Sequence, residues 1–416
     1  MKKILSLLVL IFYFFAGCSN NETIVTPESP QPTVISDIAL GDGNTFYFNI
    51  EFSPDMQYMT FTELVGGANN IARDWMCVMD KSTGTLGGDG TGKQYLLYER
   101  TGYSPDKQIN PQWGVDAQGQ FSVTLDNSGK FLIFRPNGNN APTLTTLSTP
   151  SNNTRFLPYP ARVPNRNSSL IAYTQRDPQN RIQIWVIDMA NPNNEMQITS
   201  GNLGVYSGTN SSPITLSIQR WFWPVPGAGS NTSGLPEMIY GFMNSNNKLQ
   251  IRSANFTTGS PVITDVTNDI YDHIDDFTAV MNNEKYLLGG INNSGEGRLY
   301  KFNGNLYTEQ QSIKPTPQTF LNATTCSSFE IFNWKGKYYA LYQILDNNTS
   351  ALPTGANQET WVCSLLETDV NFMVTPKTAN VRLDPEFYLA NEKLFIFYSA
   401  RLPNGKRELR KAEINL

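Results

Sequence analysis

The first repeat of the chain decides the fold. It reads FYFNIEFSPD at residues 46–55, YMTFTEL at 58–64, DWMCVMD at 74–80 and QYLLYE at 94–99. Each segment is a short run rich in aromatic and β-branched residues, and turn-forming residues such as Asn, Gly, Asp, Ser and Pro separate the runs. No stretch of the 416 residues sustains the apolar period of a helix. The pattern predicts an all-β protein of many short strands.

The same unit of strand, turn, strand, turn and strand can be laid along the chain seven times. The later units occupy residues 112–147, 155–199, 218–266, 275–311, 328–375 and 384–414. The last unit lacks a fourth strand, whereas the segment TVISDIAL at 33–40 belongs to no unit. We therefore predict a single β-propeller of seven four-stranded blades whose N-terminal strand completes the last sheet and closes the ring. Six or eight blades remain alternatives.

Two kinds of repeat motif resemble known propeller families. FSPD at 52–55, followed by YMTFT at 58–62, resembles the repeat of TolB-like propellers, although Met56 stands where that repeat often has Gly. PQWGVDAQGQF at 111–121 and IFRPNG at 133–138 resemble an NHL-type repeat. The resemblance implies a propeller, but propellers host binding and catalysis alike, so it does not name a function.

The N-terminus has the order of a bacterial lipoprotein signal. Lys2 and Lys3 precede an apolar run at residues 4–15, which is shorter than the roughly 20 residues of a membrane-spanning helix. The following Phe15-Ala16-Gly17-Cys18 resembles a lipobox. We predict a signal peptide at 1–17, an acylated (palmitate-bearing) Cys18 with a tether at 18–36, and a propeller domain at 37–416. An ordinary signal peptide with an accidental Cys is the alternative.

Ser19, which follows the lipidated Cys, resembles the pattern of lipoproteins sent to the outer membrane. The sequence leaves open whether the domain faces the periplasm or the outside. That compartment permits disulfides, and Cys326 and Cys363 fall in one predicted blade where they could pair. Alternatively these residues and Cys77 are small apolar strand residues. We expect a monomer attached to the membrane only through its lipid.

The composition excludes several kinds of catalytic and binding site. The formal net charge is −5, charged residues make up 16%, and the chain has one histidine. One imidazole cannot build a His-based zinc site, and a Ser-His-Asp hydrolase would need His273 as its base. The acidic balance gives no electrostatic footprint for nucleic acid. We therefore expect no nucleic-acid partner and no cofactor, and the shortage of catalytic groups favours a non-enzymatic role.

A ligand is expected at the channel mouth, where the loops between blades and the loops between second and third strands gather. Aromatic faces beside polar groups suit sugars or peptide side chains. The candidate ligand-binding residues there are Tyr103, Trp113, Tyr159, Arg220, Trp221 and His273. The alternative for the tryptophans is packing between sheets. The leading prediction is an envelope binding module for a glycan or a partner protein.

Acidic residues support two further hypotheses. Asp272, Asp275 and Asp276 surround His273 and could hold Ca²⁺, although their spacing matches no EF-hand and a solvated loop is the alternative. A glycoside hydrolase on a propeller would place paired carboxylates on the inner strands. The candidates by position are Asp276, Glu330, Asp384 and Glu386. A purely structural envelope scaffold is the third interpretation.

Overall fold

The computed structural model describes residues 32–416 with gaps. The gaps are 40–45, 66–70, 87–92, 102–110, 117, 128, 150–154, 163–167, 180, 201–219, 223–236, 247, 259, 269–270, 292–293, 305–306, 316–322, 347–357, 368–369, 376–381 and 402–406. The predicted signal peptide and Cys18 lie outside the described residues. In the part of the chain that is described we find no helix of the length and hydropathy needed to span a membrane.

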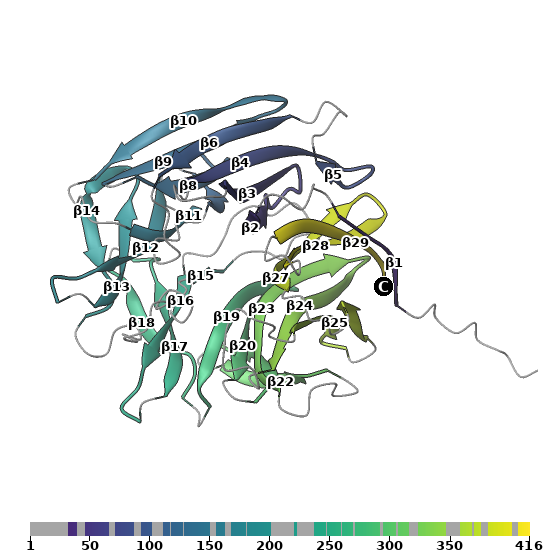
Figure 1. Ribbon diagram of the computed structural model, residues 1–416. Coiled ribbons are helices and arrows are strands. Elements are labelled where there is room, and N and C mark those ends of the chain that lie inside the picture. Colours follow the sequence, from purple (N-terminus) through teal and green to yellow (C-terminus); the bar gives the residue numbers. More distant parts are fainter. Residues whose placement is uncertain are drawn as a thin grey trace, which may run out of the picture. The chain divides into compact units, whose positions relative to one another are not determined.

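The fold is a propeller of seven sheets, as the repeats predict (Figure 1). The strands of the first three blades are β2 (Phe46–Phe52), β3 (Tyr58–Val65), β4 (Ile71–Asp80), β5 (Thr85–Leu86) and β6 (Gln94–Arg100); β7 (Gln112–Val115), β8 (Phe121–Asp126), β9 (Lys130–Asn137) and β10 (Asn140–Ser148); and β11 (Arg155–Arg162), β12 (Ser169–Arg176), β13 (Ile182–Asp188) and β14 (Asn191–Gln197). Blade 1 has five strands because both β5 and β6 pair with β4.

The remaining blades have four strands each. Blades 4 to 6 contain β15 (Arg220–Trp221), β16 (Glu237–Met243), β17 (Leu249–Asn255) and β18 (Val262–Asp265); β19 (His273–Met281), β20 (Glu284–Ile291), β21 (Glu296–Phe302) and β22 (Tyr307–Ile313); and β23 (Ala323–Trp334), β24 (Lys337–Asp346), β25 (Gln358–Leu365) and β26 (Asn371–Thr375). Blade 7 contains β27 (Arg382–Ala390), β28 (Lys393–Arg401), β29 (Arg407–Asn415) and β1 (Thr33–Ala39).

The N-terminal strand closes the ring, which confirms the prediction. β1 pairs antiparallel with β29 from Thr33 opposite Asn415 to Ala39 opposite Arg410. The backbone groups of β29 that would otherwise form an exposed edge are thereby paired. The compact unit starts at Thr33, so β1 takes in the last residues of the segment expected to be the tether.

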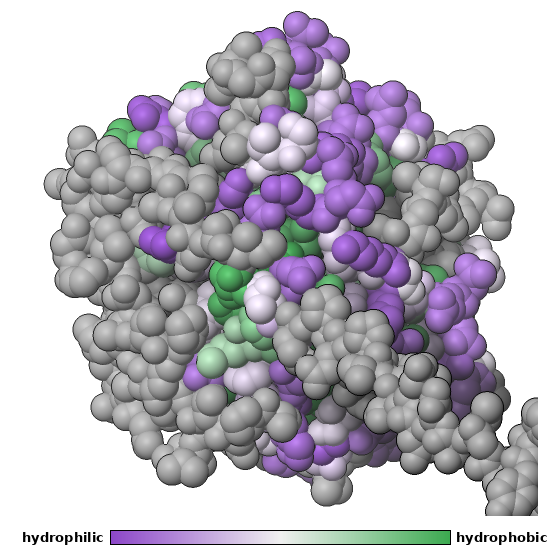
Figure 2. Space-filling model, turned by 90° about the vertical axis from the view of Figure 1, so that its right-hand side faces the viewer, coloured by the Kyte–Doolittle hydropathy of each residue, from purple (hydrophilic) through white to green (hydrophobic). Residues whose placement is uncertain are grey.

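The innermost strands form an unbroken ring around the central axis. Each of β2, β7, β11, β15, β19, β23 and β27 contacts the inner strand of the next blade, and β27 returns to β2. Between the blades lie apolar clusters such as the one that joins blades 5 and 6 around Leu288, Phe329 and Trp361. On the side shown in Figure 2, hydrophilic residues cover most of the described surface and apolar ones show in a narrow central strip.

Turn chemistry explains where the sequence departs from its repeat. Met56 takes a left-handed φ of 58° in the first hairpin, at the position where the TolB-like repeat often has Gly. Asp55 and Ser53 hold this turn, since their side-chain oxygens each accept a hydrogen bond from the Gln57 amide at 3.1 Å. Two side-chain acceptors thus hold a turn that lacks glycine.

The described cysteines behave as small apolar residues. Cys77, Cys326 and Cys363 are buried and form no disulfide. Burial raises the pKa of the Cys363 thiol to about 12, so the sulfur stays protonated and unreactive at neutral pH. The alternative of small apolar strand residues is therefore the one that the structure shows.

Candidate functional site at the channel mouth

The inner strands share an irregularity near their first residues, at the end of the ring where the inter-blade loops lie. In five blades the register of the inner strand shifts by one residue, because two residues of the inner strand lie opposite one residue of its neighbour, as between Phe48 and Glu51 in β2. The bulged residues are Asn49-Ile50, Leu157-Pro158, Asp275-Asp276, Ser328-Phe329 and Asp384-Pro385. Bulges re-aim side chains and are frequent beside binding sites. This layer of bulges is the candidate site, and we call it the bulge layer.

The backbone of the bulge layer carries strain. Asn49 and Ser328 occupy the first bulge position in their strands and have φ of 52° and 54°. Left-handed backbone is uncommon for residues other than glycine and costs of order 1 kcal/mol or more, a cost that often coincides with function. The same irregular backbone therefore recurs in blades 1 and 6.

Three carboxylates follow the bulges at one position. Glu51, Glu330 and Glu386 are each the first paired residue after the bulge, opposite Thr60, Leu341 and Phe397. Blades 6, 7 and 1 are neighbours because β27 contacts both β23 and β2. Glu386 is buried, while Glu51 and Glu330 are partly exposed. The structure thus brings two of the predicted glycosidase carboxylates, Glu330 and Glu386, to equivalent places on adjacent strands.

Sequence reasoning missed Glu51 and Asn49, although a signal was present. Each glutamate ends a triplet in which a polar residue and an apolar residue precede it. The triplets are Asn49-Ile50-Glu51, Ser328-Phe329-Glu330 and Asp384-Pro385-Glu386. Aligned at the strand starts, these triplets mark the bulges and the position that follows them.

The tryptophans predicted to bind ligand pack between blades. Trp113 is 5% exposed, stacks on Tyr58 with ring centroids 6.2 Å apart, and donates from Nε1 to the Thr60 hydroxyl at 3.2 Å. Trp221 is 1% exposed and donates from Nε1 to the backbone oxygen of Tyr159 at 3.0 Å. Both indoles join neighbouring blades, and Tyr159 is partly exposed.

His273 is fully buried at the start of β19. Its ring lies between those of Tyr271 and Tyr300, with centroid distances of 6.4 and 5.7 Å. Next to it, Asp272 accepts a hydrogen bond at 2.7 Å from the amide of Leu249 and so ties blade 5 to blade 4. Asp272 is therefore part of a junction between blades.

Several predicted site residues have no described side chain. Asp275 and Asp276 lie in the bulge of β19, Asp384 lies in the bulge of β27, and Arg220 lies on β15. Tyr103 falls outside the described residues altogether. Among the residues that are described, no three acidic, His or Cys side chains are grouped to hold a metal ion.

A polar chain crosses blade 1 beside the bulge layer. Asn49 donates to the hydroxyl of Thr62 at 3.4 Å, Thr62 donates to Asp74 at 2.8 Å, and Arg100 donates to both oxygens of Asp74 at 2.7 and 2.8 Å. Burial raises the pKa of Asp74 to about 6 even though Arg100 and Thr62 act to lower it. The chain links a strained inner residue to the outer strand of the blade.

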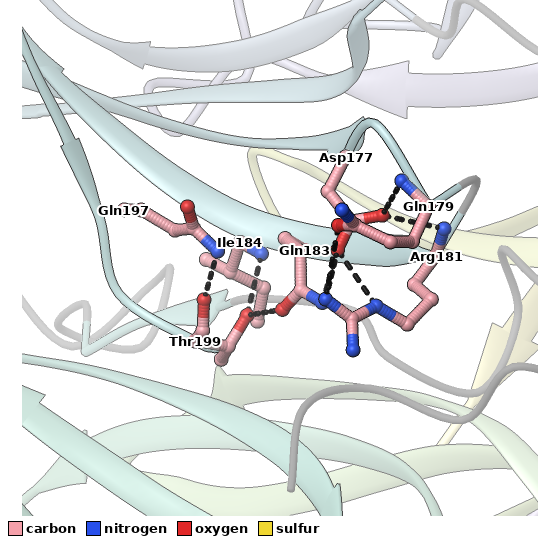
Figure 3. A network of polar contacts seen from close by, with 7 residues as sticks. All are labelled: Asp177, Gln179, Arg181, Gln183, Ile184, Gln197 and Thr199. Carbon is pink, nitrogen blue, oxygen red and sulfur yellow. Dashed lines mark hydrogen bonds and ion pairs between the residues drawn. The ribbon is translucent and has the colours of Figure 1, made fainter. Parts of the chain in front are cut away.

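Blade 3 fixes its part of the mouth by a second network (Figure 3). Asp177 accepts from the amides of Gln179 and Arg181 at 3.0 and 2.8 Å, and from the Gln183 side chain at 3.2 Å. Burial acts to raise the pKa of Asp177, but the hydrogen bonds from Arg181 and Gln183 outweigh it, so that the pKa is lowered. Gln183 in turn accepts from Thr199 at 2.7 Å.

The hydrogen bond between the Thr199 hydroxyl and the third strand of its blade recurs in other blades. This hydroxyl accepts the amide of Ile184 at 2.9 Å, and Thr267 and Thr375 accept from the third strands of blades 4 and 6 at 2.9 and 3.1 Å. Each threonine follows or ends a fourth strand, just before the chain passes to the next blade. The mouth is therefore held by equivalent hydrogen bonds in three blades, which makes it a rigid platform for the loops above it.

Comparison with known proteins shows the fold alone. No protein-family model matches the chain, and no curated protein matches its sequence. A chain of the S. cerevisiae Core Factor matches with a TM-score of 0.52 at 11% identity, over 94% of this chain and 62% of that chain, so this chain spans less than two thirds of it. An oligogalacturonate lyase in complex with manganese matches with a TM-score of 0.52 at 9% identity, over 91% and 93%.

A third structure, the β-propeller domain of Cps50 (Swd1) from Myceliophteria thermophila, has a TM-score of 0.48 at 10% identity, over 90% of this chain and 99% of that chain. These proteins differ widely in what they do, and identity near 10% carries no activity from one to another. The chain is a seven-bladed β-propeller, and its similarity to these structures concerns the fold alone.

Proposed function

We propose that this protein is a lipid-anchored propeller of the bacterial outer membrane that binds a glycan through its channel mouth. The lipobox-like Phe15-Ala16-Gly17-Cys18 and the following Ser19 support the address. The folded unit begins at Thr33, so a short segment would separate the lipid from the domain.

The bulge layer is the observation that carries the binding proposal. Polar or acidic residues fill the first bulge position in four of the five bulged strands, and glutamates follow in three neighbouring blades. Carboxylates and amides accept and donate hydrogen bonds to sugar hydroxyls. A rigid set of such groups at the end of a channel loses little entropy when a glycan is ordered against it.

The test is a glycan array probed with the full-length protein in detergent, followed by titration of each hit. The informative variant is Glu51→Gln combined with Glu386→Gln, which keeps the side-chain size and removes two charges. We expect it to weaken binding at least tenfold. The matched control is Glu309→Gln on β22, an exposed residue paired with Arg298, and should bind as the wild type does.

Saturable binding that the Glu51 and Glu386 variant reduces would support the proposal. Binding that the variant leaves unchanged would contradict a site in the bulge layer. Capture of one envelope protein without any glycan binding would instead favour a protein partner at the same face. Neither binding nor turnover, together with capture of many envelope proteins, would favour the scaffold interpretation.

One observation favours a glycoside hydrolase as the second candidate function. Glu330 and Glu386 occupy the same register position on adjacent inner strands, and glycosidases work with a pair of carboxyl groups separated by about 5 to 9.5 Å. One carboxyl would protonate the leaving oxygen and the other would act as base or nucleophile. Release of reducing ends from oligosaccharides by the wild type, abolished in Glu386→Gln, would establish this activity.

A further inference from the structure

A cavity of about 410 Å³ lies between blades 4 and 5, at the end of the ring opposite the channel mouth. Its lining comes from the starts of β16, β18, β20 and β22 and from the ends of β17 and β21. At these strand ends the first strand of each blade turns into the second and the third turns into the fourth. The bulge layer lies at the other end, where the inner strands begin. The cavity is therefore separate from the candidate site described above. Its volume falls within the range of small-molecule pockets.

A buried ion pair fixes one wall of this cavity. Lys285 Nζ lies 2.6 Å from Glu237 Oε2, and the two side chains are 18% and 7% exposed. The same ammonium group lies 3.8 Å from the centroid of the Phe302 ring. The Glu237 carbonyl accepts the amide of Phe222 at 3.1 Å, which holds the start of β16 in place. The wall is consequently preorganised, and its lysine is already neutralised.

The rest of the lining is polar but carries little net charge. Four hydroxyl side chains face the cavity together with the amide side chain of Asn255, and Asp265 adds one carboxylate that Arg252 neutralises at 2.5 Å. Val262 lines the cavity and is 57% exposed, so an apolar surface is available to a ligand. The hydroxyl side chains are those of Ser253, Thr257, Thr258 and Thr264.

Tyr307 contributes a hydroxyl without a partner. Among the described residues its oxygen is buried and forms no hydrogen bond, and its ring lies 5.0 Å from that of Phe302. Burial and the nearby charge of Glu237 raise the pKa of this phenol, so it remains a neutral donor and acceptor. An unsatisfied buried hydroxyl destabilises the folded state, and a ligand hydroxyl that reaches it would offset that cost.

These features select a ligand class. Glu237 already neutralises the charge of Lys285, so an anion would gain no attraction there. It would also be repelled by the carboxylates of Glu237 and Asp265. The hydroxyls of Thr257 and Thr258 each donate one hydrogen bond, to Asn255 and to the Ser260 carbonyl, and can still accept another, a capacity that a flat apolar ligand would not use. A neutral ring that bears hydroxyls on its edge and C–H groups on its face matches both the polar groups and the apolar patch. We propose that this cavity binds a neutral sugar residue.

The experiment is saturation-transfer NMR on the full-length protein in detergent with D-glucose, D-galactose, D-mannose and N-acetylglucosamine as probes. Thr258→Trp fills the cavity from an exposed turn position. Its matched control is Thr308→Trp, also exposed, on β22 beside Tyr307 but outside the lining. We expect at least one sugar to bind saturably, Thr258→Trp to weaken it at least tenfold, and Thr308→Trp to leave it unchanged.

A second variant separates binding from folding. Tyr307→Phe removes a hydroxyl that has no hydrogen bond in the described part of the protein, so the melting temperature should not fall. Affinity for the sugar should fall severalfold if the ligand uses that hydroxyl. No saturable sugar binding, equal binding by Thr258→Trp, or binding of inorganic phosphate in place of sugars would each overturn the proposal. Glycan binding at the channel mouth does not involve Thr258 and should persist in that variant.

Discussion

The contact between blades 2 and 3 and the contact between blades 6 and 7 are held by opposite chemistry. In the first, the fully buried Arg155 of blade 3 lies 3.5 Å from Asp126 of blade 2, and Glu195 of its own blade holds it at 2.8 Å. In the second, the rings of Phe332 and Phe387 stack with centroids 4.9 Å apart at 29°. Both contacts join inner strands of neighbouring blades to the sheets beside them, so the difference lies in the side chains.

The two contacts differ in how strictly they require a particular geometry. A buried guanidinium must meet its carboxylates with correct geometry, because the cost of removing charges from water is several kcal/mol per ion. Aromatic stacking depends on area and tolerates changes of shape. The polar contact should therefore fix the rotation of blade 3 on blade 2 and fail abruptly, whereas the aromatic contact should hold blade 7 on blade 6 and fail gradually.

Arg155→Met is the most severe test of this comparison. It leaves Asp126 buried at 1% exposure without its cation, and it removes the guanidinium that lies 4.9 Å from the centroid of the Phe131 ring. We expect a loss of about 3 to 5 kcal/mol in the free energy of unfolding, measured by urea denaturation. Arg73→Met is the control, since Arg73 and Glu99 form an exposed pair whose loss should cost under about 1 kcal/mol. Equal losses in the two variants would contradict a structural role for the buried pair.

The pH dependence of stability should separate the polar contacts from the aromatic ones. Asp74 in blade 1 has its pKa raised by burial from 3.8 to about 6. The folded state therefore binds its proton more tightly than the unfolded state, so the contribution is complete below pH 3.8 and is lost as the pH rises towards 6. The loss is at most about 3 kcal/mol, at about 1.4 kcal/mol per pKa unit.

The measurement is the difference in unfolding free energy between the wild type and Asp74→Asn at several pH values. As the pH rises from about 4 to about 6, the wild type should lose stability relative to the asparagine variant, and above that pH the difference should stay constant. A difference that changes in the opposite direction would show that the Arg100 ion pair outweighs the desolvation of Asp74. Phe387 carries no titratable group, so the aromatic contact should add nothing to this pH dependence.

The blade arrangement was predictable because each blade repeats one local pattern. The alternation of apolar residues fixes the strands, the turn residues fix the hairpins, and the missing fourth strand at the end pointed to the segment 33–40. The bulges were not predictable from alternation, because Phe48-Asn49-Ile50-Glu51-Phe52 alternates apolar and polar residues without a break although the bulge shifts the pairing by one residue. Asn49-Ile50 therefore reads as part of an ordinary strand.

The candidate site was harder to predict because it depends on which blades are neighbours and on burial. Trp113 and Trp221 have the composition of a ligand surface, yet the structure packs both between sheets. Glu330 and Glu386 were found by their places on inner strands, but their equivalence needs the register of both pairs of strands. The cavity between blades 4 and 5 draws its lining from distant strand ends, and no local motif marks it.

Gly114→Ala tests how closely blades 2 and 3 must approach. A Cβ at Gly114 would lie 2.1 Å from the backbone oxygen of Pro160 in the next inner strand, so the strands would have to separate. We expect a loss of about 1 to 3 kcal/mol by urea denaturation. Gly297→Ala is the control, because the atom nearest to its Cβ, at 2.9 Å, belongs to the ring of Phe329, which can move. A larger loss at Gly297 would show that side-chain packing limits the approach of blades more than the backbone does.

Phe387→Leu should have the smallest effect and tests the tolerant side of the comparison. Leucine keeps an apolar side chain against Phe332 but removes the stacked ring, and such swaps in a core usually cost under about 1.5 kcal/mol. Urea denaturation should therefore show a shallow loss, and Phe387→Tyr should cost more because it buries a hydroxyl next to a ring that offers no acceptor. If Phe387→Leu were as damaging as Arg155→Met, the aromatic contact would be as demanding as the ionic one. The orientation of the blades would then depend on shape complementarity at both contacts, and charge would have no special part in it.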